Sequence, residues 1–178
     1  MYRNLSFAFL FVLICALSSF AQEAQPTPEK QVSAKDQQKE LRLKACGTEK
    51  VNYDAKTDKT DRPAPEQPAD KALIYVVRTA MLGYKIHSKL AVDGKWMGVN
   101  RGNTHFYFTL DAGEHFFCSE SENQDYLALK VEAGKTYYLK QQVEMGMFKA
   151  RTNLTVLNEE EGKKAVAKTN LSVFELKK

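Results

Sequence analysis

The sequence predicts an all-β protein: a small antiparallel β-sandwich of seven to eight strands, with a short C-terminal helix and a disordered N-terminal linker. Three observations predict this fold. From Ala72 to the C-terminus the chain contains no proline. Thirteen of its 19 aromatic residues lie in this part, which supplies a core. Turn residues, mainly glycine, recur there roughly every ten residues, a spacing typical of short antiparallel strands.

Residues 1–21 have the features of a secretory signal peptide. A short apolar run, residues 7–17, follows a single positive charge. This run is too short to span a bilayer, and Ser19 and Ala21 are the small residues that a cleavage site before Gln22 requires. We therefore expect an exported protein, periplasmic or extracellular, with no transmembrane helix in the mature chain.

The cysteines carry two further expectations. Cys15 raises the alternative of a lipoprotein, but bulky Ile14 stands where lipoprotein cleavage needs a small residue. If Cys15 leaves with the signal peptide, Cys46 and Cys118 remain in a compartment where disulfides persist. We expect them to pair and to tie the N-terminal segment to the domain, the alternative being two unrelated thiols.

Residues 22–71 differ in composition from the rest of the chain. All five prolines lie here, with one aromatic residue, Tyr53, and ten basic residues against ten acidic ones. Such a segment cannot bury a core, so it is predicted to be a disordered or extended linker. Ser33 followed by Asp36 resembles a capping box and indicates a short helix over residues 34–45.

Residues 72–178 are predicted to form the sandwich domain, and runs of β-branched and aromatic residues mark its strands. Several of these runs alternate with period two, so each such strand is expected to bury one face. The predicted strands are residues 72–79, 85–93, 95–99, 104–110, 115–121, 126–132, 136–144 and 148–157.

Specific turns connect these strands. Asp93 and Gly94 fit a two-residue type I′ hairpin, which needs positive φ at both positions. The segments around Gly113 and Gly134 are predicted to be hairpin loops as well. His115 directly follows the first of these loops, so we expect it to make a hydrogen bond that fixes the loop.

The chain is predicted to end with a helix and an ambiguous tail. Asn158 can cap three consecutive glutamates, and lysines follow toward the other end, which suits the helix dipole. Residues 169–178 contain enough apolar side chains for a further strand or for loose packing. The pattern does not distinguish these two alternatives.

Three motifs resemble a known family. They are L-A-V-D-G-K at residues 90–95, F-T-L-D-A-G-E-H at residues 108–115 and V-E-A-G-K-T-Y-Y-L at residues 131–139. Together they resemble the bacterial family of unknown function DUF2846, and they are similar to the hairpins of surface-associated PEGA modules. The resemblance covers about residues 72–157. It implies an exported bacterial all-β domain, and it assigns no catalytic residue.

Composition and motifs argue against several function classes. A net charge of +4 is too small for the dense basic stripe of a nucleic-acid-binding protein. The sequence has no nucleophile elbow and no glycine-rich phosphate loop. His105 and His115 would lie too far apart on one hairpin to share a metal ion. We therefore expect no nucleic-acid partner, no catalytic residue, no metal and no cofactor.

The aromatic residues are more numerous than one buried face needs. Most of them are expected to fill the core, and the remainder, with nearby basic residues, are candidates for a recognition surface. The candidates are Trp96, Tyr107, Tyr137, Tyr138, Arg101 and Arg151.

These observations predict a non-enzymatic binding or interaction module of the bacterial envelope. Its partner would be a protein, a glycan or a lipid. Two alternatives stay open: a carrier of a lipid or other small molecule, and a small metal-dependent hydrolase whose site is assembled from distant strands.

Overall fold

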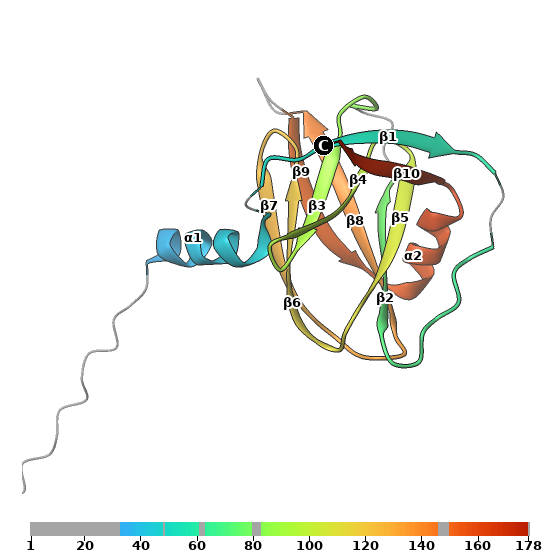
Figure 1. The fold of residues 1–178 in the computed structure, drawn as a ribbon, viewed down its shortest axis with the longest axis horizontal. Coiled ribbons are helices and arrows are strands. Elements are labelled where there is room, and N and C mark those ends of the chain that lie inside the picture. The colour runs from blue at the N-terminus through green and yellow to red at the C-terminus, as the bar shows by residue number, and fades with distance from the viewer. Residues whose placement is uncertain (1–32, 48, 61–62, 80–82, 146–149, 178) are drawn as a thin grey trace, which may run out of the picture. The chain divides into compact units, whose positions relative to one another are not determined.

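A computed structural model describes residues 33–47, 49–60, 63–79, 83–145 and 150–177 (Figure 1). The predicted signal peptide and Cys15 lie outside the described residues. The elements in chain order are α1 (Ala34–Ala45), β1 (Asn52–Asp58), β2 (Ala72–Arg78), β3 (Ser88–Val92), β4 (Lys95–Asn100), β5 (Thr104–Leu110), β6 (Gly113–Glu120), β7 (Gln124–Val131), β8 (Thr136–Met145), β9 (Ala150–Leu157), α2 (Glu159–Val166) and β10 (Asn170–Lys177).

The strands form two sheets that face each other, which confirms the predicted all-β sandwich. The large sheet has the strand order β1-β10-β5-β2-β8-β9, and the small sheet has the order β4-β3-β6-β7. The described residues contain ten strands, more than the seven or eight predicted, because β1 and β10 are added. Two neighbouring pairs in the large sheet, β2 with β8 and β5 with β10, are parallel, so the sandwich is not wholly antiparallel.

Strand β1 lies inside the segment predicted to be a linker, which is therefore not disordered throughout. Its exposure alternates along the strand, with Tyr53, Ala55 and Thr57 on the less exposed side. It pairs antiparallel with β10 at the end of the chain, and the ring of Tyr53 meets that of Phe174 edge-on at 5.7 Å. A strand this polar depends on its partner, and the partner is more than a hundred residues away in sequence.

Only one of the three predicted hairpins at glycine turns is a hairpin. Asp93 and Gly94 have φ of 49° and 79° and join β3 to β4 within the small sheet, as predicted. The turn at Gly113 instead carries the chain from β5 in the large sheet to β6 in the small one, and the turn at Gly134 returns it from β7 to β8. These two crossings explain why β8 runs parallel to β2.

The main core lies between the two sheets. Burying a large aliphatic or aromatic side chain contributes roughly 1.5–3 kcal/mol, so this layer dominates the stability of the sandwich. Its buried members are Ala72, Ile74, Val76, Leu90, Val92, Phe106, Phe117, Val131, Leu139 and Leu154.

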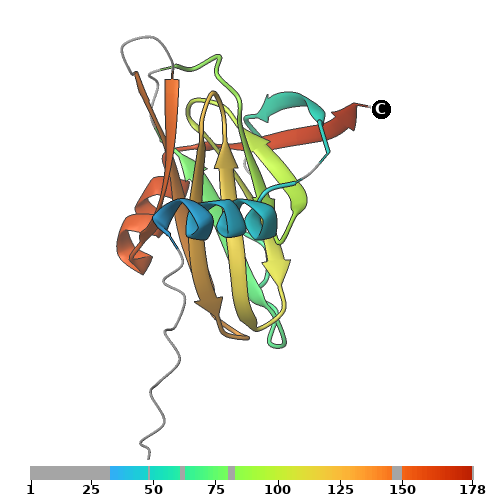
Figure 2. The ribbon, with the colours of Figure 1, turned by 90° about the vertical axis from the view of Figure 1, so that its left-hand side faces the viewer.

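The two helices cover the outer faces of the two sheets. Helix α1 begins after its N-cap Ser33 and lies across β6 and β7 of the small sheet (Figure 2). Helix α2 begins after its N-cap Asn158, whose side chain accepts a hydrogen bond from the backbone N–H of Glu161, and it packs on β2 and β8 of the large sheet. Within the described residues, no helix is long and apolar enough to cross a membrane.

Candidate functional site

A disulfide joins Cys46, just after α1, to Cys118 in β6. Their Cα atoms lie 5.0 Å apart, and both residues are buried in a small cluster on the outer face of the small sheet. Trp96 belongs to the same cluster, and its indole N–H donates to the carbonyl of Glu49 at 2.9 Å. These contacts hold the segment after α1 against the small sheet.

Two more of the predicted recognition residues have partners within the chain. Arg101 donates from Nε and Nη2 to the hydroxyl of Thr57, at 3.0 and 2.6 Å, and so fastens β1. Tyr138 is buried, with its ring stacked on Tyr75 at 5.3 Å in the layer beneath α2. Trp96, Arg101 and Tyr138 thus lie in three different places.

The other three candidates are equally dispersed. The hydroxyl of Tyr137 accepts a hydrogen bond from the backbone N–H of Glu132 at 3.1 Å, next to the turn between the sheets. Arg151 is exposed on β9, at one edge of the large sheet. Tyr107 is 38% exposed and lies on the outer face of the large sheet. The six candidates therefore do not form one surface. Of the six, Tyr107 alone lines a cavity on the outer face of the large sheet.

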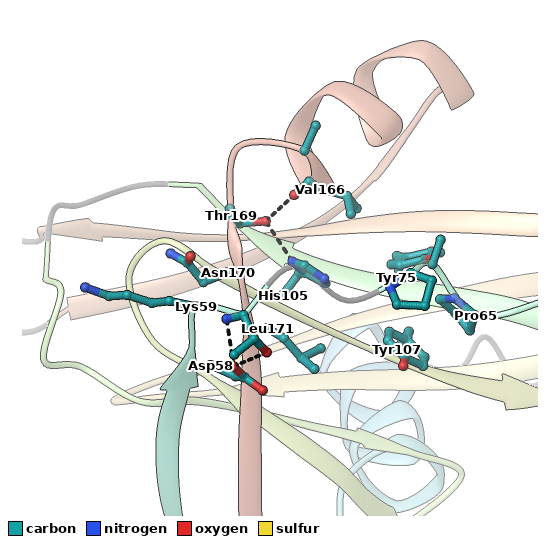
Figure 3. Close-up of a pocket in the computed structure, with 14 residues that line it drawn as sticks. Asp58, Lys59, Pro65, Tyr75, His105, Tyr107, Val166, Thr169, Asn170 and Leu171 are labelled. Atoms are coloured by element: carbon teal, nitrogen blue, oxygen red, sulfur yellow. Dashed lines mark hydrogen bonds between the residues drawn. The ribbon is translucent and has the colours of Figure 1, made fainter.

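A cavity of about 330 Å³ opens on the outer face of the large sheet (Figure 3). Side chains of β2 and β5 form its floor. Residues 58–60 and 63–65 form one wall, and the end of α2 with the start of β10 forms a second wall. The floor contains Tyr75, His105 and Tyr107. The first wall contains Asp58, Lys59 and Pro65, and the second contains Thr169 and Asn170.

His105 is held in one tautomer by the wall behind it. Its Nδ1 lies 2.9 Å from the hydroxyl oxygen of Thr169, and that hydroxyl lies 3.1 Å and 3.0 Å from the carbonyl oxygens of Ala165 and Val166. Because the single hydroxyl proton is used on these carbonyls, Nδ1 of His105 is the donor to Thr169. Its Nε2 then carries a lone pair, and no described residue hydrogen-bonds to it.

Burial keeps the His105 imidazole neutral. It lowers the pKa of His105, and the hydrogen bond at Thr169 opposes this effect without reversing it. A neutral ring with its proton on Nδ1 offers an acceptor at Nε2. The position can therefore receive a hydrogen bond from an O–H or N–H group of a ligand.

Three aromatic rings lie side by side on the cavity floor. The ring centre of Tyr75 is 5.6 Å from that of Tyr107 and 6.2 Å from that of His105. Burial raises the pKa of Tyr75 to about 12, with smaller contributions from the neighbouring Tyr138 and Tyr107. The Tyr75 hydroxyl therefore stays protonated at physiological pH and can donate or accept a hydrogen bond.

Among the described lining residues, Asp58 and Lys59 carry formal charges, and they lie together at one end of the cavity, away from the tyrosines. Figure 3 shows Asp58, Lys59 and Asn170 at that end and Tyr75 with Tyr107 at the other. Asp58 accepts hydrogen bonds from the backbone N–H and the hydroxyl of Thr60, at 2.9 and 2.7 Å.

A second group of polar residues, buried between the sheets, has its hydrogen bonds satisfied within the protein. The side-chain N–H groups of Asn100 donate to the carbonyl of Val76 and to Gln141, and its oxygen accepts from Thr104. Gln141 donates in turn to Ser119 at 3.0 Å and to a backbone carbonyl. This network joins the two sheets, and its side-chain amides use their hydrogen-bonding groups within the protein and not on a ligand.

The described residues contain neither a candidate metal site nor a cysteine with a free thiol. No group of three or more His, Cys, Asp or Glu side chains there is arranged to hold a metal ion. The two described cysteines are joined to each other as a disulfide.

The sequence pattern of β5 predicts part of the cavity floor. His105 and Tyr107 alternate with Phe106, which is buried in the core, so they had to lie on the opposite face of that strand. No local pattern predicts that Asp58 and Thr169 line the cavity, because its walls come from segments before β2 and after α2 that are far apart in sequence.

Comparison with known proteins confirms the resemblance to the DUF2846 family. Residues 68–153 match the family described as "Protein of unknown function (DUF2846)". An uncharacterized protein of Haemophilus influenzae is 39% identical over 102 residues, which cover 56% of this chain and 60% of that relative. No solved structure matches the chain significantly. These comparisons support the domain and assign no activity to it.

Proposed function

From the premise that residues 68–153 form a domain of the DUF2846 family, we propose that this chain is a non-enzymatic binding module that works outside the cytoplasm, in the cell envelope. The observation that carries the proposal is the cavity on the large sheet. Concave sites that combine aromatic side chains with a few oriented polar groups are typical of ligand binding. Here Tyr107 offers an accessible ring and His105 offers an oriented acceptor.

The proposal of export is supported by the Cys46–Cys118 disulfide. Such bonds persist in oxidising compartments and are rare in the cytosol. We propose that the chain loses residues 1–21 on export and reaches the periplasm or the cell exterior without a lipid anchor. Its partner there is an envelope protein, glycan or lipid.

Intact mass spectrometry of the protein from the envelope fraction of its native host tests the location. We expect a mass that begins at Gln22 and is lower by two hydrogen atoms than that of the reduced chain, which corresponds to one disulfide in the mature chain. An acylated Cys15 at the N-terminus would contradict the unanchored form. A mass that retains residues 1–21, with free thiols, would contradict export.

Thermal unfolding of the same protein against fractionated envelope material tests binding. A ligand that binds the folded state and not the unfolded state raises Tm, and the rise grows with ligand concentration relative to Kd. We expect at least one fraction to raise Tm, Tyr107→Ala to abolish the rise, and Tyr84→Ala to preserve it. Tyr84 is a suitable control because it is 40% exposed, as Tyr107 is at 38%, and does not line the cavity. No rise with any fraction would contradict the proposal.

The same preparation separates the two alternative functions. A lipid or pigment that co-purifies with the protein in stoichiometric amount would favour a carrier. Turnover of envelope material, lost on removal of a bound metal, would favour a hydrolase.

A further inference from the structure

We infer that two copies of this chain form a weak homodimer by antiparallel pairing of their β1 strands. The contact is the outer edge of β1, the edge that faces away from β10. The inference goes beyond the proposed function and does not use the cavity. The position of β1, the charges along it and the symmetry of self-pairing each support it.

Strand β1 is the last strand of the large sheet in the described part of the chain, and Figure 1 shows it along one margin of the domain. Antiparallel pairing with β10 directs the N–H and C=O groups of alternate residues away from β10. Within the described residues, the backbone hydrogen bonds of residues 52–57 go to β10 and to no other segment. The outer edge of β1 therefore presents backbone groups that a further strand can bind.

The other edge of the large sheet, at β9, is closed by side chains. The backbone N–H of Thr152 donates to the side-chain oxygen of Asn123. The backbone N–H of Leu154 donates to the carboxylate of Asp125 at 2.7 Å. Among the described residues, no side chain makes such bonds to the backbone of residues 52–57. Of the two edges, the β1 edge is thus the one prepared for another strand.

The inner face of β1 is fastened to the domain. The ring of Tyr53 meets Phe174 edge-on, and Phe174 in turn meets Phe106 of the main core at 5.3 Å. Toward the other end of the strand, the hydroxyl of Thr57 accepts two hydrogen bonds from Arg101. An edge that is already ordered loses little conformational entropy when a second strand pairs with it.

The outer face of β1 carries two opposite charges, Asp54 and Lys56. Both residues are exposed, and neither forms an ion pair with a described residue. Across the ladder, Asp54 lies directly opposite Glu175 of β10, and like charges in this arrangement destabilise a sheet. A cation on the other side of Asp54 would compensate this repulsion, and a strand paired with the outer edge of β1 is in a position to supply it.

The symmetry of a dimer places such a cation beside Asp54. A twofold axis perpendicular to the sheet pairs β1 with β1 of the second copy so that the same faces meet. Ala55 is the middle residue of β1, so all seven residues overlap when Ala55 lies opposite Ala55 of the second copy. In this register Asp54 lies opposite Lys56 of the second copy, and the symmetry makes the pair twice.

The charges also disfavour the neighbouring registers. With the axis at residue 54, Asp54 would face Asp54 of the second copy, and with the axis at residue 56, Lys56 would face Lys56. Both arrangements repel. A lysine on an edge strand ordinarily opposes pairing with another strand. Here the aspartate two residues away turns that repulsion into attraction in the one register with full overlap.

Sedimentation equilibrium of the mature, disulfide-bonded protein tests the inference. A single pair of seven-residue strands buries less surface than a stable dimer needs, so we expect a Kd between roughly 50 µM and 1 mM. Raising the salt concentration from about 0.05 M to 0.5 M should weaken the dimer several-fold, because it screens the exposed ion pairs. The contact uses the edge completely, so association should stop at the dimer.

Two charge reversals connect the dimer to β1. In a dimer of Lys56→Glu or of Asp54→Lys, like charges face each other, so each variant alone should associate at least roughly 10-fold more weakly than the wild type. An equimolar mixture of the two variants restores opposite charges at both positions. The mixture should therefore associate about as tightly as the wild type.

A matched control reverses a charge on another edge strand. Lys130 is exposed on β7, at one edge of the small sheet, and Lys130→Glu should leave the association unchanged. Circular dichroism and amide exchange in β1 verify that each variant is folded and retains this strand.

Three outcomes would overturn the inference. The first is a wild-type protein that stays monomeric at about 1 mM. The second is a dimer that both charge reversals leave unchanged, or that the mixture of variants does not restore, because the contact would then lie elsewhere. The third is growth beyond the dimer, which a closed twofold contact does not allow. None of them decides the proposed binding function, whose test is the dependence of the Tm rise on Tyr107.

Discussion

The imidazole of His115 lies 2.6 Å from the carboxylate of Asp93, measured from Nδ1 to Oδ2. Its Nε2 lies 2.9 Å from the backbone carbonyl of Asp111. A carboxylate and a carbonyl both accept hydrogen bonds, so the ring satisfies both only when each nitrogen carries a proton. Protonated His115 thus connects the β3–β4 hairpin to the turn that crosses between the sheets.

This contact predicts a pH-dependent contribution to stability. Burial by itself would lower the pKa of His115, but the hydrogen bonds to Asp93 and Asp111 and their negative charges outweigh it and raise the pKa. A raised pKa in the folded state contributes stability that is fully present below the unfolded value of about 6.5 and is lost as pH rises through the folded value. We expect a His115–Asp93 coupling free energy of about 1 kcal/mol at pH 5.5 and a smaller one at pH 9.

A double-mutant cycle with His115→Asn and Asp93→Asn, measured by urea unfolding at both pH values, checks this expectation. Asparagine tolerates the positive φ of residue 93, so the turn is preserved. Burial lowers the pKa of His87 and of His105, so these two groups make the wild-type protein more stable as pH rises, which is opposite to the effect of His115. The cycle is needed because it removes their contribution. Equal coupling at both pH values would contradict a protonated His115.

The Cys46–Cys118 disulfide is expected to retain α1 on the small sheet. An isolated helix of 12 residues is marginal in water, and one residue of α1, Ala45, is buried. The bond closes a loop with a sequence separation of 72, so its removal in a Cys46→Ser, Cys118→Ser variant should lower the free energy of unfolding by about 4 kcal/mol.

Limited proteolysis and hydrogen exchange check where that stability is lost. Cleavage should begin within α1 in the disulfide-free variant, while β2 and β8 stay protected. Leu43→Ser is a matched control on the same helix, because Leu43 is 66% exposed and its change should alter stability by less than about 0.5 kcal/mol. Protection of α1 after loss of the bond would mean that packing alone holds the helix.

Local sequence patterns predicted β2 to β9 because alternation and turn residues act over a few positions. The same patterns could not predict which sheet a strand joins. Gly134 has φ of 71° and lies in a tight turn, but a tight turn serves a hairpin and a crossing between sheets equally well. The partner of β1 and the walls of the cavity depend on contacts between distant segments. For this reason the sequence predicts Tyr107 as a candidate site residue and does not predict Thr169.

The hydrogen bonds between Arg101 and Thr57 are expected to stabilise β1 at the edge of the large sheet. Thr57→Val removes the acceptor and keeps the shape of the side chain, so it should lower the free energy of unfolding by about 1 kcal/mol. Amide exchange in β1 should accelerate more than exchange in β2. Thr57→Ser retains the hydroxyl and is the control. If the serine variant loses as much stability as the valine variant, packing of the methyl group matters and the hydrogen bond does not.

Gly162 allows α2 to approach the large sheet closely. A Cβ atom at this position would lie 2.1 Å from Cγ of Tyr138, well inside the contact distance of two carbon atoms. In a helix, alanine is favoured over glycine by about 1 kcal/mol, whereas forcing an extra carbon into a packed site costs about 1–3 kcal/mol. The clash is expected to dominate, so Gly162→Ala should lower the free energy of unfolding by about 1 kcal/mol.

Displacement of α2 should also reach the cavity, because the end of this helix positions the hydroxyl that fixes His105. In Gly162→Ala we therefore expect weaker binding of any ligand that the cavity takes, together with the loss of stability. Urea unfolding and calorimetry of the same samples measure both effects. Glu160→Ala, at an exposed position of α2, is the control and should change neither. A stability gain of about 1 kcal/mol in Gly162→Ala, the value that helix propensity alone predicts, would show that the helix can move away from Tyr138 without cost.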